Sequence, residues 1–142
     1  MKTMGHFLAD NNRQIYSVSP DTTVREALEL MAQKNIGALL VLDGETLAGI
    51  FSERDYARKV VLKGKSSNEA LVKDIMTAEV ITVESTQNID HCMRIMTDHH
   101  IRHLPIMEQQ QVKGLISIGD VVKEMMAHQK TTIEQLQSYI AG

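Results

Sequence analysis

The chain has 142 residues, a formal net charge of −3 and a single cysteine. This length suits one compact domain or two small ones sharing a core, and it buries enough surface to fold without a disulfide or a structural metal. The acidic balance and the presence of only three Tyr and two Phe argue against nucleic-acid binding. Apolar runs such as "ALLVL" are far shorter than the roughly 20 residues that cross a bilayer.

The N-terminal stretch "MKTMGHFLAD" lacks the apolar segment of a signal peptide, and Cys92 has no second cysteine with which to form an intrachain disulfide. We therefore expect a cytoplasmic protein in a reducing compartment, with no membrane partner.

The first structured half of the chain reads strand, helix, strand, strand, helix. A short apolar strand at 15–18 is followed by the turn "SPDTT", whose Thr residues are good helix N-caps, and by a helix with apolar residues at helical spacing from Val24 to Met31. The runs 38–42 and 47–51 flank "DGET", a strong hairpin signal. A helix is expected over 53–63.

The second half has the same order. A strand at 80–83, the turn "ESTQN" and a helix from Ile89 precede strands at 103–107 and 112–117, joined by "EQQQ", and a helix at 119–128. The polar link between the two halves, "GKSSNEALVKD", is expected to be partly helical. The tail carries Ile133, Leu136 and Ile140 on one helical stripe, which either packs on its own domain or contacts a partner.

The two halves are an internal repeat. Residues 15–60 align with 80–125 without a gap, and many further positions exchange one apolar residue for another. The identical pairs are Val18/Val83, Met31/Met96, Ile36/Ile101, Leu39/Leu104, Gly49/Gly114, Ser52/Ser117 and Asp55/Asp120. Since each unit alone would leave one sheet face uncovered, we predict an α/β (α+β) fold of two pseudo-symmetric β-α-β-β-α units packed through their sheets.

The last three identical pairs form the motif Gly-x-x-Ser-x-x-Asp at a junction of strand and helix. Ser-x-x-Asp is typical of a capping box, in which serine and aspartate satisfy each other's backbone N–H groups. The same helix N-terminus suits a phosphate, and its carboxylate can accept hydrogen bonds from a ribose diol. A cap and a binding site are therefore both open interpretations.

In these features the chain resembles tandem cystathionine-β-synthase (CBS) domains, the Bateman module of stand-alone bacterial-type CBS proteins. The motifs that carry the resemblance are "DIMT", "IRHLPIM" and the repeated Gly-x-x-Ser-x-x-Asp. It covers about residues 8–129, as a first CBS unit (8–66) and a second CBS unit (67–129), and leaves a helical tail at 130–142. The resemblance implies a regulatory homodimer that binds adenosine-containing ligands in two clefts between the paired sheets and acts on an unidentified protein.

The ligands implied by the resemblance are AMP, ADP or ATP, with NAD(H) or S-adenosylmethionine also possible, so that the module would sense energy or redox state. Each cleft would combine one unit's Ser-x-x-Asp with the strand entry of the other. The expected residues are Asp120 and Asp55 for ribose; Ser117, Arg102, His103, Ser52, Arg54 and Arg58 for phosphate; and Asn12, Ile15, Tyr16, Thr77, Val80 and Pro105 lining the clefts.

The two sites are expected to differ, because Arg102 and His103 align with the uncharged Gly37 and Ala38. We expect an AMP-like ligand at Asp120 and a different or larger one, such as NAD or ATP, at Asp55. For Arg54 and Arg58, a solvated helix face is the alternative interpretation.

The sequence contains no motif of an enzyme or a metal protein. His99 and His103 are four apart, but the chain is expected to pass from helix to strand between them, so no metal site is predicted. Cys92 falls on an apolar face and is expected in the core. We predict a protein that is not an enzyme; the alternative to a nucleotide sensor is a constitutive dimerisation or scaffold module without ligand.

Overall fold

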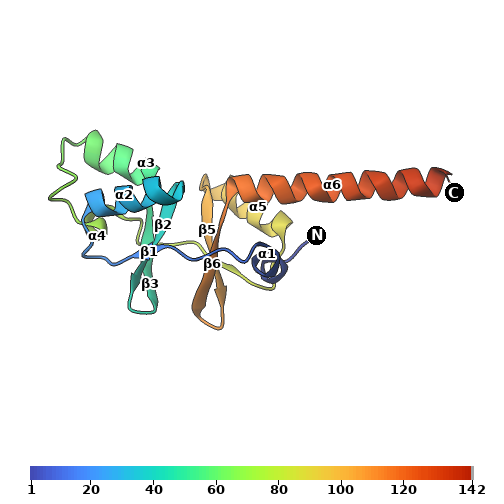
Figure 1. Cartoon of the computed structure of the whole chain (residues 1–142), viewed down its shortest axis with the longest axis horizontal. Coiled ribbons are helices and arrows are strands. Elements are labelled where there is room, and N and C mark those ends of the chain that lie inside the picture. The colour runs from blue at the N-terminus through green and yellow to red at the C-terminus, as the bar shows by residue number, and fades with distance from the viewer. Residues whose placement is uncertain (142) are drawn as a thin grey trace. The chain divides into compact units, whose positions relative to one another are not determined.

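The computed structural model describes residues 1–141, and within them it contains two three-stranded sheets, six α-helices and one π-helix (Figure 1). The mixed α+β class predicted from the sequence is confirmed. The elements of the first repeat are β1 (Ser17–Val18), α2 (Val24–Lys34), β2 (Ala38–Asp43), β3 (Thr46–Ser52), α3 (Glu53–Tyr56) and η1 (Ala57–Val61). The elements of the second are β4 (Val83–Glu84), α5 (Ile89–His99), β5 (His103–Glu108), β6 (Gln111–Ser117) and α6 (Ile118–Ala141).

Two further helices, α1 (Met4–Asn11) and α4 (Val72–Ile75), precede the repeats. The polar link was expected to be partly helical, and α4 confirms this. Helix α1 was not predicted from the sequence, although Thr3 caps it by accepting a hydrogen bond from the His6 backbone N–H.

The long helices of both repeats begin and end in the same way. The side chain of Thr23 accepts from the backbone N–H of Glu26, and that of Asn88 accepts from His91, so the predicted N-caps are confirmed. Both helices end at a left-handed residue, Asn35 in α2 and His100 in α5.

Each sheet is built around a hairpin. Strand β1 pairs in parallel with β2, and β2 pairs antiparallel with β3 around a turn in which Gly44 has a φ of +64°. In the second sheet β4 pairs in parallel with β5, and β6 lies beside β5. The turn of the second hairpin holds Gln109 and Gln110 at positive φ, so glutamines adopt there a conformation that glycine favours.

The prediction of a single helix over 53–63 is only partly correct. Only Glu53–Tyr56 is α-helical, and the next five residues form the π-helix η1, in which the Leu62 backbone N–H donates to the Ala57 carbonyl. A π-helix widens the turn by one residue, and such turns often occur near functional sites.

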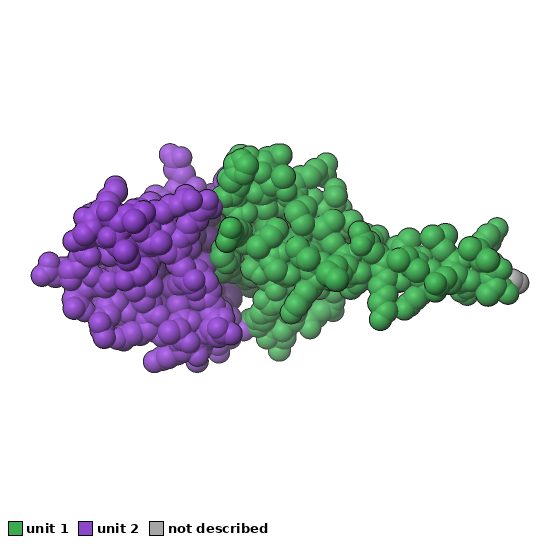
Figure 2. Space-filling model, turned by 90° about the horizontal axis from the view of Figure 1, so that it is seen from above, with its two compact units in different colours: residues 1–13, 82–109, 113–142 green, residues 14–81, 110–112 purple. Residues whose placement is uncertain are grey.

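The chain divides into two compact units (Figure 2): unit 1 holds residues 1–13, 82–109 and 113–142, and unit 2 holds residues 14–81 and 110–112. In unit 1 the segment before the first repeat lies on the second repeat, because the backbone N–H groups of Met4 and Gly5 donate to Gln87 and Ser85. Met4 and Phe7 of that segment are buried.

Unit 2 repeats the arrangement with the segment before the second repeat. The Val24 N–H donates to the Ala70 carbonyl, the Val72 N–H donates to the Thr22 carbonyl, and Val72 and Ile75 are buried with α2, β2 and β3. Each compact unit therefore joins one repeat to the helical segment that precedes the other repeat in the sequence.

The tail is helical through Ala141 and continuous with the helix before it, so that α6 runs for 24 residues. Ile133, Leu136 and Ile140 are 54%, 57% and 82% exposed. Of the two expectations for this stripe, packing on its own domain is therefore wrong. No helix in residues 1–141 is both long and apolar enough to span a membrane.

Candidate functional site

Both copies of the Ser-x-x-Asp motif form a capping box. In unit 2 the Asp55 Oδ2 atom accepts from the Ser52 backbone N–H at 3.0 Å and from its hydroxyl at 3.1 Å, while the Asp55 N–H donates to Ser52 Oγ. In unit 1 Asp120 Oδ2 accepts from the Ser117 N–H and hydroxyl, both at 2.9 Å, and the Asp120 N–H donates to Ser117 Oγ. Each aspartate thus has one oxygen fixed by the cap.

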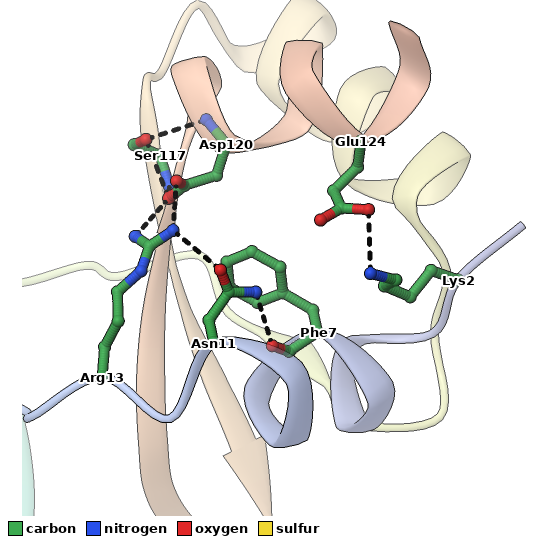
Figure 3. A network of polar contacts seen from close by, with 7 residues as sticks. All are labelled: Lys2, Phe7, Asn11, Arg13, Ser117, Asp120 and Glu124. Carbon is green, nitrogen blue, oxygen red and sulfur yellow. Dashed lines mark hydrogen bonds and ion pairs between the residues drawn. The ribbon is translucent and has the colours of Figure 1, made fainter. Parts of the chain in front are cut away.

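The second oxygen of each aspartate faces a cationic side chain. Arg13 reaches Asp120 with both guanidinium N–H₂ groups, at 2.6 Å to Oδ1 and 3.0 Å to Oδ2 (Figure 3). In unit 2, Lys59 Nζ lies 3.1 Å from Asp55 Oδ1, and the Thr77 hydroxyl donates to the same oxygen at 3.2 Å. The repeats therefore share the cap and a cation, but the cation is a different residue type in each.

Arg13 is held from several directions but stays accessible. Its guanidinium lies 5.3 Å from the centroid of the Phe7 ring and also contacts the Asn11 side chain, while half of the Arg13 side chain, 51%, is exposed. Asp120 is 11% exposed. A half-exposed cation thus pairs with a nearly buried carboxylate.

The charge state of this pair is fixed at neutral pH. Partial burial alone would raise the pKa of Asp120, but hydrogen bonds from Arg13 and from the Ser117 backbone and hydroxyl outweigh it and lower the pKa. The hydrogen bond to Asp120 raises the pKa of Arg13. Asp120 is therefore an acceptor only, which suits hydroxyl and N–H donors.

The other predicted residues of unit 1 lie around the start of β5, within β5 and at the end of α1. Arg102 is exposed, and its backbone carbonyl accepts from the Ile118 N–H at 2.8 Å, which places it beside the first turn of α6. His103 is half-buried at the start of β5, and Pro105 is buried within it. Asn12 is exposed in left-handed conformation at the end of α1.

In unit 2 the structure brings Thr77 to Asp55 and leaves the predicted arginines on the surface. Arg54 and Arg58 are exposed, on α3 and η1 respectively. Tyr16 packs against the core of the unit, with Lys34 Nζ 5.3 Å from the ring centroid. Ile15 is exposed and Val80 is half-buried.

The sequence analysis did not select Lys59 or Arg13. The signal for Lys59 was present, because it follows Asp55 by four residues and such pairs lie on one helix face. Arg13 lies between Asn12 and Ile15, which were expected to line a cleft, but a position 107 residues away carries no local pattern that identifies its partner.

Unit 2 also contains an open cavity of about 670 Å³ between α2 and the start of α3. It is lined by Leu28, Met31, Ala32, Asn35, Ile36, Gly37, Glu53 and Tyr56. The lining combines apolar side chains with Asn35 and Glu53 and does not include Asp55. This cavity is therefore separate from the ion pair between Asp55 and Lys59.

The described residues 1–141 contain no cluster of three His, Cys, Asp or Glu side chains that could hold a metal ion. Cys92 is fully buried, as predicted, and burial raises the pKa of its thiol to about 11. Its protonated thiol lies 3.4 Å from the Met4 sulfur, a packing contact without nucleophilic character.

Two sheet-and-helix repeats, each with a capped aspartate at the start of its last helix, define a tandem-repeat module. The family model for the CBS domain matches residues 9–62 and 72–127, and the chain belongs to this family. Chains of this kind are generally regulatory rather than catalytic.

Named relatives agree. The chain is 41% identical over 127 residues to the mitochondrial CBS domain-containing protein CBSX3 of Arabidopsis thaliana, covering 86% of this chain but 62% of that protein. It is 53% identical to a putative signal-transduction protein with CBS domains from Burkholderia ambifaria, with a TM-score of 0.80 and coverage of 83% and 87% of the two chains.

A third structure shares the fold at 23% identity, with a TM-score of 0.74 and coverage of 82% and 91%. It is the CBS domain pair of protein MJ0100 in complex with 5′-methylthioadenosine and S-adenosyl-L-methionine.

Proposed function

We propose that the chain is a regulatory module that binds adenosine-containing ligands, with Asp120 and Asp55 accepting hydrogen bonds from the ribose hydroxyls. The observation that carries the proposal is that the two oxygens of each aspartate have different partners. Oδ2 is fixed by the capping box and Oδ1 contacts a cation, which at Asp120 is the half-exposed Arg13 that also reaches Oδ2. A ribose diol offers two hydroxyl donors, which match the acceptors that an outgoing cation leaves.

The fixed oxygen matters because it orients the free one without a further entropic cost on binding. The MJ0100 complex supports the ligand class, since both of its ligands contain adenosine. That relative shares only the fold, so the choice among AMP, ADP, ATP and NAD(H) rests on the residues of this chain.

The two sites are proposed to differ. At Asp120 the ligand displaces Arg13, whose guanidinium can then pair with a phosphate, together with Arg102 and His103 beside the first turn of α6. At Asp55 the cation is Lys59, which also donates to the Ile75 carbonyl at 3.1 Å and is thereby held by the fold. We propose an AMP-like ligand at Asp120 and a larger ligand such as ATP or NAD at Asp55.

The remaining parts of the proposal follow from this role. The ligand biases the module between two states through its different affinity for them, and a protein partner responds to the change. A homodimer and a cytoplasmic location, in keeping with the single reduced and buried Cys92, belong to the proposal. The alternative function is a scaffold module without ligand, and the following test distinguishes the two.

The test is isothermal titration of AMP, ADP, ATP, NAD(H) and S-adenosylmethionine into wild type, Asp120→Asn and Asp55→Asn. Asparagine keeps one oxygen for the cap and replaces the other with a donor group. Each variant should lose about a hundredfold or more in affinity at its own site, because hydrogen bonds to a charged group contribute about 1.5–3 kcal/mol. Asp90→Asn, a surface aspartate of the same chain paired with Arg94, is the matched control.

Arg13→Ala separates ribose from phosphate recognition. Removing the competing cation should tighten the binding of adenosine, which has no phosphate, and reduce the advantage of AMP over adenosine. If no compound in the panel binds the wild type, the scaffold interpretation replaces the sensor.

A further inference from the structure

The second half of α6 has no partner within its own unit. Every residue from Met126 to Ala141 is exposed, and Figure 2 shows this part of the helix extending beyond the body of unit 1. A helix that is packed against nothing is marginally stable in water, because most helical stability in proteins comes from burial of an apolar face. The exposed half of α6 therefore calls for a surface that covers it.

The apolar residues of α6 follow a heptad pattern. We define the α6 seam as six positions spaced alternately by four and three residues: Val122, Met126, Gln129, Ile133, Leu136 and Ile140. Five of the six are apolar. A 4-3 spacing is the pattern of a coiled coil, in which Met126, Ile133 and Ile140 occupy a positions and the others occupy d positions.

The seam is accessible along its whole length. Val121 is buried on unit 1, whereas the seam residues that follow it in the first turns, Val122 and Met126, are 41% and 64% exposed. With about 3.6 residues per turn, the seam lies roughly a quarter turn away from the buried face. A second helix can thus lie along the seam without displacing the packing of α6 on unit 1.

We propose that the α6 seam binds the α6 seam of a second copy of this chain, as a parallel two-stranded coiled coil. The seam spans 19 residues, about 28 Å of helix. Ile at a positions with Leu at the neighbouring d position is the combination that favours two strands over three or four. A second copy is the occupant that necessarily carries the matching pattern.

The polar residues of α6 favour the parallel orientation of the two helices. In a parallel pair each layer meets its own counterpart, so Gln129 faces the Gln129 side chain of the second copy and the two amides can hydrogen-bond. The antiparallel pairing that matches all six positions would place Gln129 against Ile133 and leave the amide unsatisfied. It would also bring the two Lys130 ammonium groups together, whereas the parallel form places Lys130 beside Met125.

The first measurement is the molar mass of the full chain by light scattering after size exclusion, across a concentration series. Wild type should be a dimer, and Ile133→Glu with Leu136→Glu should raise its dissociation constant by at least about a hundredfold, since a carboxylate would be buried in the seam. The control, Thr131→Glu with Ser138→Glu, adds the same charge on the opposite face and should leave the mass unchanged. All four side chains are exposed, so neither variant removes core contacts.

The second measurement fixes the orientation. Under mild oxidation Ile140→Cys should form an interchain disulfide, because a-position Cα atoms of a parallel pair lie within disulfide range. Ser138→Cys, on the outer face, should not, and wild type controls for the buried Cys92. In the antiparallel form the two residues at position 140 would lie about 27 Å apart and could not be joined.

A monomeric wild type, a trimer or tetramer, or a dimer that survives the seam substitutions would overturn the proposal. Loss of the dimer in the seam variant without a disulfide in Ile140→Cys would overturn the parallel arrangement. Ligand titration of the same variants tests the proposed nucleotide site independently of the dimer, since the seam contains none of the residues of that site.

Discussion

At the scale of single residues, the repeated aspartate combines a helix cap with a contact to a cationic side chain. The cap uses Oδ2 of Asp55 and of Asp120, and Oδ1 of each aspartate contacts a cationic side chain. The serine positions the carboxylate in both repeats, and the cation beside it, Lys59 or Arg13, differs. Both repeats therefore keep the same acceptor in different electrostatic surroundings.

Acid should weaken the fold partly through Asp120. Its pKa in the folded state is below the ordinary value of 3.8, so its contribution to stability is present above that value and is lost as the pH falls through the folded-state pKa. Urea unfolding of Asp120→Asn should therefore show a shallower loss of unfolding free energy between about pH 5 and pH 3 than wild type does.

Arg13→Ala should reproduce part of the Asp120→Asn effect, because the arginine supplies two of the hydrogen bonds that lower the pKa. Identical acid slopes in wild type and both variants would show that the pair contributes nothing to the pH dependence of stability.

At the scale of the elements, close crossings explain why Gly49 and Gly114 recur. A Cβ on Gly49 would lie 2.7 Å from the Thr77 carbonyl oxygen and 2.7 Å from the Met76 sulfur, whereas a Cβ on Gly114 would meet only the end of the Leu8 side chain. In unit 2 the segments that cross at Gly49 are held together by two hydrogen bonds between the Ile50 and Thr77 backbones, at 3.0 and 2.9 Å. Backbone cannot move away as a leucine rotamer can.

Gly49→Ala should therefore cost about 1–3 kcal/mol of unfolding free energy, the range of overpacking substitutions. Gly114→Ala should cost less than about 1 kcal/mol, since Leu8 can change rotamer. The two unfolding curves measure the difference directly, and equal losses would contradict this account. Because Thr77 also donates to Asp55, Gly49→Ala should in addition weaken the ligand binding that we propose at Asp55.

At the scale of the whole molecule, the chain exchanges its helical segments between the repeats. Residues 1–13 complete unit 1, whose other parts begin 69 residues later at Thr82. Met4 and Phe7 are 0% and 2% exposed in that unit, and the bridge between Thr3 and Asn88 joins the segment to the start of α5. The stability of the second repeat thus depends on the far end of the sequence.

Deleting residues 1–13 should consequently loosen unit 1 rather than the repeat that follows the deletion. Hydrogen exchange should lose protection in β4, α5 and β5, while α2, β2 and β3 retain it, because local stability follows buried contacts rather than sequence order. Met4→Ala, which removes one buried side chain, should produce a milder loss in the same elements. Protection lost first in α2 would contradict the exchange of segments.

The sequence by itself determined the repeat, the order of its elements, the N-caps at Thr23 and Asn88, the hairpin at Gly44 and the reciprocal bonding of Ser-x-x-Asp. All of these depend on residues within a few positions of one another, where spacing fixes geometry. The family resemblance drawn from the same motifs agrees with the match of the family model.

Only the tertiary structure decided which cation stands beside each aspartate, that residues 1–13 lie on the second repeat, and that the end of α6 is exposed. These depend on contacts between residues far apart in the chain, as between Arg13 and Asp120. The π-helix at Ala57–Val61 belongs here too, because the same residues satisfy a helical apolar pattern with either turn width. Periodicity identifies the apolar face of a helix; what covers that face is settled by the fold.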